Sequence, residues 1–105
     1  MNPDRLAEYI DHIRQAASDA CSFVRGMDKA TFQGDIRTQR AVVMSQIIVG
    51  EAETKVMDQC PEFASAHPEV PWRGMRNRIA HGYFDINLDV VWDTVLTALQ
   101  AWTTM

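Results

Sequence analysis

The sequence predicts an all-α protein, an antiparallel four-helix bundle with a short third helix, in a single domain that covers residues 1–105. Apolar residues recur with helical spacing in two long segments and in the C-terminal segment. Proline, glycine and aspartate punctuate the chain between these segments. No segment alternates polar and apolar residues with a period of two, so we expect no sheet.

The first helix is expected to begin at Pro3, after the capping residue Asn2, and to end at Gly26. Its apolar residues follow one another at alternating steps of four and three, which predicts a single buried stripe along a long helix. These residues are Leu6, Ile10, Ile13, Ala17, Ala20 and Val24.

A connector with a short helical turn is expected over residues 28–34, and Asp35 then caps a second long helix that runs to about Asp58. The apolar residues of this helix crowd more than one face, which predicts burial on more than one side. One side would pack on the core and another on a partner subunit; alternatively, the helix is central in a monomeric bundle. The residues concerned are Ala41, Val42, Val43, Met44, Ile47, Ile48 and Val49.

The second half of the chain is more broken. Residues 61–71 contain three prolines, which predicts a loop. Pro71 suits the first turn of a short third helix from Trp72 to about His81, and Gly82 then interrupts the chain. The fourth helix has a continuous apolar stripe formed by Leu88, Val91, Trp92, Val95, Leu96, Leu99 and Trp102.

Composition excludes several classes of protein. A chain with 47% hydrophobic residues is not disordered, and a net charge of -4 argues against a general nucleic-acid-coating protein, although it allows a local basic site. No apolar run is long enough to cross a bilayer, and the N-terminus lacks the features of a signal peptide, so we expect a cytoplasmic protein with no membrane association. Cys21 and Cys60 are expected to be packing residues in a reducing compartment, without a metal site.

The segment from Trp72 to Phe84 is the part of the chain that carries chemistry. On a helix, at about 100° per residue, it has an apolar stripe on one side and a polar row on another. Arg76 lies at the border, where its apolar stem can cover the core while its head reaches the polar side. The stripe consists of Trp72, Met75 and Ile79, and the polar row of Arg73, Asn77 and His81.

These residue types match what RNA cleavage without a metal requires: a base, an acid and positive charge on the phosphorane. His81 can serve as either acid or base near neutral pH, and Arg76 offers a planar cation that fits phosphate oxygens. Asn77 can orient either group without titrating. An arrangement of two histidines would need two chains. Alternatively, His81 caps the helix and the arginines form a solvated face.

The run from Arg76 to Tyr83, RNRIAHGY, resembles the R-x4-H-x-Y signature of HepT-like toxins in the HEPN superfamily. Asn77 also resembles the polar residue that follows the arginine in the wider HEPN pattern. The order of two long helices, a loop, a short motif-bearing helix and a final helix is similar as well. The resemblance implies a HEPN-type bundle and a homodimer in which the two motifs form one composite RNA-cutting site.

The same resemblance implies the role of each residue. Arg76 would stabilise the scissile phosphate, His81 would transfer protons, and Asn77 would orient them. The products would carry a cyclic phosphate and a 5′-hydroxyl, without a metal or another cofactor, and the substrate would be tRNA or mRNA. Binding would rest on Arg73, Arg76, Arg78 and one of Arg37 and Arg40, and a carboxylate, either Glu51 or Glu53, would join the site from the second helix.

Tyr83 is the remaining motif residue. The resemblance implies a nucleotidyltransferase antitoxin that silences the toxin by attaching AMP to Tyr83, because a bulky anion beside His81 would repel RNA phosphate. Without the resemblance, Tyr83 would be read as an amphipathic residue that packs the loop.

Two other functions remain open. One is a non-catalytic HEPN-like partner of a nucleotidyltransferase, which binds a nucleotide or a protein with the same surface. The other is a purely structural bundle. Of the histidines outside the motif, His12 is expected to be solvated, and His67 gives no indication of function.

Overall fold

The computed structural model describes residues 3–75 and 86–104. This part of the chain contains no strand, which confirms the predicted all-α class. Its helices in chain order are α1 (Pro3–Phe23), α2 (Lys29–Gln33), α3 (Ile36–Gln59), α4 (Pro61–Ala66), α6 (Leu88–Thr94), the π-helical turn η2 (Val95–Leu99) and α7 (Gln100–Thr103).

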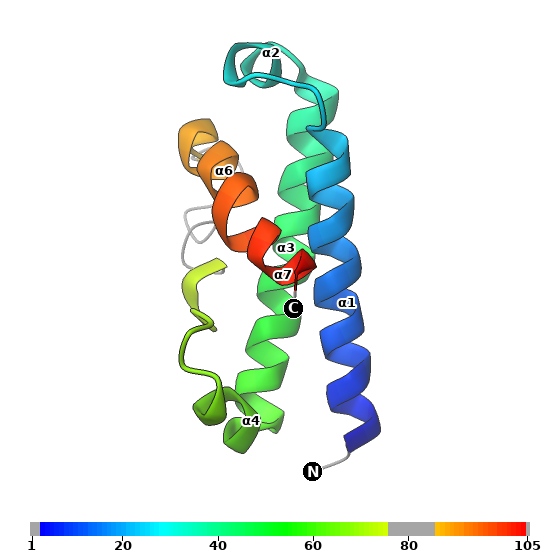
Figure 1. Cartoon of the computed structure of the whole chain (residues 1–105), viewed down its shortest axis with the longest axis vertical. Helices are drawn as coiled ribbons and strands as arrows, with labels where there is room; N and C mark the ends of the chain where they lie inside the picture. Colours follow the sequence, from blue (N-terminus) through cyan, green and yellow to red (C-terminus); the bar gives the residue numbers. More distant parts are fainter. Residues whose placement is uncertain (1–2, 76–85, 105) are drawn as a thin grey trace.

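The two long helices, α1 and α3, lie side by side and antiparallel, and they form the main body of the molecule (Figure 1). The predicted stripe of α1 is confirmed: Ile13, Ala17 and Ala20 are completely buried, while the residues nearer the N-terminus are partly buried. After the last turn of α1, Gly26 adopts a φ of 79°, a left-handed conformation that favours glycine. The chain can therefore reverse within a few residues.

Two aspartates begin the next helices, as capping residues do. Asp28 accepts a hydrogen bond from the backbone N–H of Thr31 at 2.8 Å, and Asp35 accepts one from that of Thr38 at 3.3 Å. Hydrogen bonds from Thr31 and Thr38 lower the pKa of Asp28 and Asp35 respectively. Both the short helical connector and the cap of the second long helix are thus confirmed.

The prediction of a loop over residues 61–71 is wrong in its first half, because Pro61–Ala66 form the helix α4. Pro61 occupies the beginning of this helix, where a missing N–H costs nothing and the fixed φ of proline suits the helix. The two other prolines of this stretch follow the helix. The predicted third helix begins with a turn at Trp72 and Arg73. Residues 76–81 of that predicted helix lie outside the described residues.

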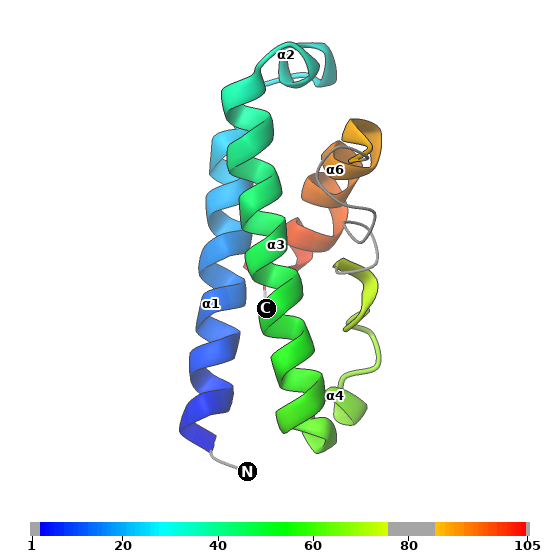
Figure 2. The same cartoon turned by 180° about the vertical axis from the view of Figure 1, so that it is seen from behind.

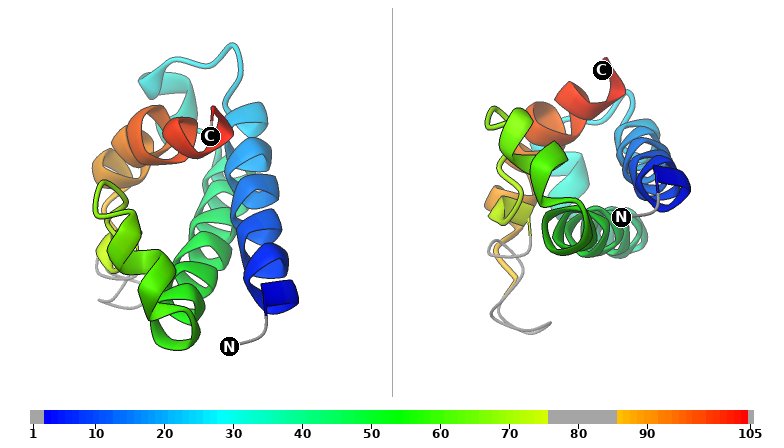
Figure 3. Two further views of the ribbon diagram at one scale, coloured as in Figure 1. Left: turned by 60° about the horizontal axis from the view of Figure 1, so that its bottom comes forward. Right: turned by 90° about the horizontal axis from the view of Figure 1, so that it is seen from below.

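The C-terminal segment is one helical run interrupted by a π turn. Asn87 caps its start by accepting a hydrogen bond from the N–H of Asp89 at 2.9 Å. α6 packs against α2 and α3, whereas η2 and α7 pack against α1 (Figure 3). The predicted stripe is confirmed except at Leu96, which is 48% exposed, while Thr94 is buried in its place. Val95, Leu99 and Trp102 keep helical spacing through η2, at residues 95–99, and Leu96 lies at the edge of this stripe.

The two cysteines are packing residues, as predicted. Cys60 is buried and Cys21 partly buried, and both are free thiols. Burial raises the pKa of the Cys21 thiol. Within residues 3–75 and 86–104, no helix is long and apolar enough to cross a membrane.

Candidate active site

The motif lies in a stretch that the structure does not describe, but both of its flanks are described. The predicted roles in this stretch remain predictions, and they concern Arg76, Asn77, Arg78, His81 and Tyr83. The described flanks are Trp72–Met75 on one side and Ile86–Leu88 on the other.

Trp72 anchors the chain just before the motif. Its indole N–H donates to the carbonyl oxygen of Ala64 at 3.0 Å and to that of His67 at 3.1 Å. Its ring meets the ring of Phe63 edge-on, with 6.1 Å between the centroids. Met75 is also buried, so the predicted apolar face is confirmed at its two described members. The segment that leads into Arg76 therefore starts from a fixed point in the core.

Arg73 is a predicted substrate-binding residue within the described part of the chain. It is exposed, and its Nε donates to the sulfur of Met57 on α3 at 3.2 Å. A thioether is a weak acceptor, so this contact leaves the charge of the guanidinium uncompensated. Arg73 can therefore attract an anion to the surface beside the motif.

On the other flank, Ile86 lines a cavity of about 220 Å³ against the N-terminal half of α3. Arg40 also lines this cavity, whereas Arg37 does not. Arg40 is exposed and thus places a cation near the end of the motif segment. The structure therefore favours Arg40 over Arg37 as the arginine that α3 would contribute. The remaining residues of this cavity are Ile36, Gln39, Val43 and Leu88.

Glu53 and Glu51 are two residues apart in sequence but lie on different faces of α3. Glu53 is only 2% exposed, and one of its carboxylate oxygens accepts a hydrogen bond from the indole N–H of Trp102 at 3.2 Å. It lines a cavity of about 360 Å³ together with Met75, the residue just before Arg76. Glu51 is exposed and lies near Ile48 and Lys55 on another part of the surface. Of the two glutamates, the one beside the start of the motif is Glu53.

The sequence contains a signal that distinguishes these two glutamates. Buried residues of α3 recur at alternating steps of four and three, and Glu53 falls in that register while Glu51 does not. A charged residue in a buried stripe must have polar partners. The register of the stripe therefore favours Glu53 over Glu51 as a candidate site residue. The stripe consists of Val42, Gln46, Val49, Glu53, Val56 and Cys60.

The cavity beside Glu53 is acidic. Its lining also includes Glu69, whose pKa is lowered by hydrogen bonds from its own backbone N–H and from the His67 side chain. Two carboxylates in one cavity repel phosphate. A phosphate group would therefore be repelled from this cavity and attracted to exposed arginines such as Arg73 and Arg40.

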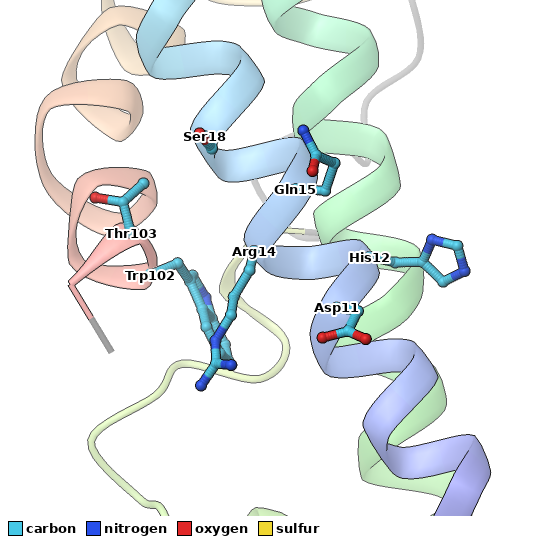
Figure 4. Close-up of a pocket in the computed structure, with 7 residues that line it drawn as sticks. All are labelled: Asp11, His12, Arg14, Gln15, Ser18, Trp102 and Thr103. Atoms are coloured by element: carbon cyan, nitrogen blue, oxygen red, sulfur yellow. The ribbon is translucent and has the colours of Figure 1, made fainter.

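A larger polar cavity, of about 600 Å³, lies between α1 and α7 (Figure 4). Arg14 extends beside the ring of Trp102, while the His12 ring points away from that tryptophan. His12 is exposed, which confirms the predicted solvated position. The other residues that line this cavity are Asp11, Gln15, Ser18 and Thr103.

Comparison with known proteins decides the family. A family model described as ribonuclease HepT-like matches residues 13–103, nearly the whole chain. The chain belongs to the HepT-like ribonuclease family. This match confirms the resemblance in family, while the R-x4-H-x-Y motif itself is not what the match shows.

Relatives of the HepT-like chain carry ribonuclease names. A protein of Thermococcus cleftensis named a probable ribonuclease HepT is 34% identical over 91 residues, which cover 84% of this chain and 80% of the relative. A candidate RNase of Caldanaerobacter subterraneus is 36% identical, with 84% and 79% covered. A candidate RNase of Methanocaldococcus jannaschii is 33% identical, with 84% and 73% covered. No solved structure matches the chain. Ribonuclease activity is thus supported at the level of the family.

Proposed function

We propose that this HepT-like protein is a metal-independent endoribonuclease toxin of a toxin–antitoxin pair. It cleaves tRNA or mRNA at a composite site formed across a homodimer, and a nucleotidyltransferase silences it by attaching AMP to Tyr83. The observation that carries the proposal is the set of Arg76, Asn77, His81 and Tyr83 in a chain that the HepT-like family covers from residue 13 to 103.

The chemistry of these residues supports cleavage without a metal. His81 removes the 2′-hydroxyl proton of the ribose, and the 2′-oxygen then attacks the adjacent phosphorus. The bond from phosphorus to the 5′-oxygen breaks, and a second His81, from the partner subunit, returns a proton to that oxygen. Arg76 neutralises the phosphorane and Asn77 orients the reacting groups. The products are a 2′,3′-cyclic phosphate and a 5′-hydroxyl, so atoms and protons balance.

A face of α3 that stays exposed in the described part of the chain supports the homodimer. Ile36, Met44 and Ile48 are 61%, 56% and 40% exposed, and they are spaced at multiples of four residues with Arg40 in the same row. We call this row the outer face of α3. Figure 2 shows α3 from the side that no other described helix covers. Large apolar side chains that are exposed in a row on one helix are typical of a protein–protein contact. Burial of this face against a second copy would bring Arg40 of both chains near the proposed composite site.

Silencing through Tyr83 follows from charge. AMP on the Tyr83 oxygen would add a negative phosphodiester two residues from His81, where it would repel the RNA phosphate. Co-expression of the toxin with the nucleotidyltransferase should add the mass of one AMP to the peptide that contains Tyr83, and Tyr83→Phe should prevent the addition. A toxin that is silenced with an unmodified Tyr83 would contradict this part of the proposal.

The cleavage itself is tested by induced expression in a bacterial host, with total RNA separated on a gel. Wild type should arrest growth and produce new RNA fragments, and Arg76→Ala and His81→Ala should do neither. Arg14→Ala and His12→Ala are matched controls, because they remove an exposed arginine and an exposed histidine outside the motif. Both controls should remain toxic.

The same experiment separates the proposal from its alternatives. If wild type and all variants are soluble, folded and equally harmless, the ribonuclease proposal fails and a non-catalytic partner of a nucleotidyltransferase is the better account. In that case AMP or a nucleoside triphosphate should bind to wild type and more weakly to Arg76→Ala. A purely structural bundle would show neither activity nor binding.

A further inference from the structure

Trp102 on α7 contacts two side chains close to the start of the motif segment, Glu53 and Trp72. Its indole N–H donates to the carboxylate of Glu53 on α3 at 3.2 Å, and both side chains are buried, with Trp102 only 5% exposed. A buried carboxylate requires hydrogen-bond donors to offset the loss of water. Trp102 supplies one of them from a helix that is remote from α3 in sequence.

The ring of Trp102 makes the second contact. It meets the ring of Trp72 edge-on, with 6.0 Å between the centroids. Trp72 is itself held by two hydrogen bonds to carbonyl oxygens at the end of α4. Trp102, Glu53 and Met75 also line the same cavity. One side chain of α7 therefore restrains both the buried carboxylate and the backbone segment that leads directly into Arg76.

The helix that carries Trp102 is irregular at the turn before it. η2 is a π turn of five residues, Val95–Leu99, between α6 and α7. The hydroxyl groups of Thr94 and Thr97 donate to carbonyl oxygens four residues earlier, at 2.7 Å each, a bond that tends to bend helices. π turns are uncommon and occur frequently at functional sites. After this turn, α7 packs against α1, and Trp102 reaches Glu53 on α3.

We infer that Trp102 is a positioning residue for the RNA-cleaving site. Its N–H fixes the carboxylate of Glu53, and its ring fixes Trp72, so that α7 determines the position from which the motif begins. This inference rests on the proposed ribonuclease function. Trp102 is not a catalytic residue, since it is buried and is not placed to touch RNA. Its loss should therefore lower the rate of the chemical step and leave substrate binding nearly unchanged.

Trp102→Phe is the variant that tests the inference, because it keeps an aromatic ring and removes the N–H. Trp92→Phe is the matched control, since Trp92 is also buried but packs on Phe32, with 5.2 Å between the centroids. Purified variants are compared for kcat and KM on an RNA substrate. Displacement of reacting groups by a fraction of an ångström should lower kcat of Trp102→Phe by roughly tenfold to a hundredfold, with KM within about twofold. Trp92→Phe should keep the wild-type kcat per folded molecule.

A double-mutant cycle distinguishes the positioning role of Trp102 from a purely structural role. Glu53→Leu and Trp102→Phe should each lower kcat, and the double variant should be no slower than the slower single variant, because each change removes the same hydrogen bond. Additive losses, or equal kcat values for Trp102→Phe and Trp92→Phe, would overturn the inference.

Hydrogen exchange does not depend on RNA cleavage, so it tests the role of Trp102 separately from the proposed function. Backbone hydrogen exchange in peptides that span residues 70–75 should become faster in Trp102→Phe and stay at the wild-type rate in Trp92→Phe. If wild type cuts no RNA, the proposed function fails, and exchange alone decides whether Trp102 holds this segment. Unchanged exchange at residues 70–75 in Trp102→Phe would contradict the inference in either case.

Discussion

The inner and outer faces of α3 both carry apolar residues, but the two faces differ in what covers them. On the inner face, Val49 and Val56 are completely buried against the rest of the chain, and Glu53 is buried among them. On the outer face, Met44 and Ile48 are exposed. In the proposed homodimer, one helix would serve both the fold and the assembly. The inner face stabilises the fold and places Glu53 beside Met75, and the exposed outer face would contact the second copy.

The largest difference between the faces should appear when the same charge is placed on each. Val49→Asp introduces a buried carboxylate with no partner of its own, which should cost about 4 kcal/mol or more and unfold a domain of this size. Met44→Asp puts the same group on the outer face and should leave the helical content intact. Circular dichroism during thermal unfolding measures both. A folded Val49→Asp protein would mean that the inner face is not the core.

The second difference concerns assembly. Met44→Asp should convert a dimer in solution into a monomer and abolish RNA cleavage, because the composite site then lacks its second His81. Analytical ultracentrifugation together with a cleavage assay measures the two effects. Leu96→Asp is the control, since Leu96 is also an exposed large apolar residue but lies on η2. A dimer that survives Met44→Asp and Ile48→Asp together would place the interface elsewhere.

A smaller effect distinguishes the two glutamates. Glu53→Ala leaves the Trp102 N–H without its acceptor in the core, and should lower the free energy of unfolding by about 1–3 kcal/mol. Glu51→Ala, on an exposed position, should change it by no more than about 0.5 kcal/mol. Urea denaturation measures both values. Equal effects would contradict the assignment of the two residues to different environments.

The smallest effect is expected at the start of α3. The lowered pKa of Asp35 means that its charged form stabilises the folded state fully above the ordinary carboxyl pKa. This stabilisation is lost as the pH falls through the lowered value. Asp35→Asn should therefore show a smaller decrease in melting temperature than wild type between pH 5 and about pH 2. Identical pH profiles of the two proteins would show that the cap contributes nothing through its charge.

Most of the fold could be predicted from the sequence, because long amphipathic helices and their caps depend on local rules. The stripe of α1, the cap at Asp35 and the connector between them follow from spacing and residue type alone. The predicted loop is wrong where one residue type is compatible with two structures. Pro61 is compatible with a loop, but proline is equally suited to the first turn of a helix, where it lies in α4.

The site could be predicted only in part, because its supporting contacts join residues distant in sequence. The motif predicts the chemistry of the site, and the burial of Met75 and Trp72 agrees with the predicted apolar face. The hydrogen bond between Trp102 and Glu53 spans 49 residues and follows an irregular turn, η2, that regular helical spacing does not predict.

The most direct test of the central claim is cleavage of a defined RNA by the purified wild-type protein in the presence of EDTA, with the ends of the fragments identified by mass spectrometry. We expect cleavage that EDTA does not reduce, fragments with a 2′,3′-cyclic phosphate and a 5′-hydroxyl, and no cleavage by His81→Ala. Intact RNA, or fragments with 5′-phosphate ends that form only when a divalent metal is present, would contradict it.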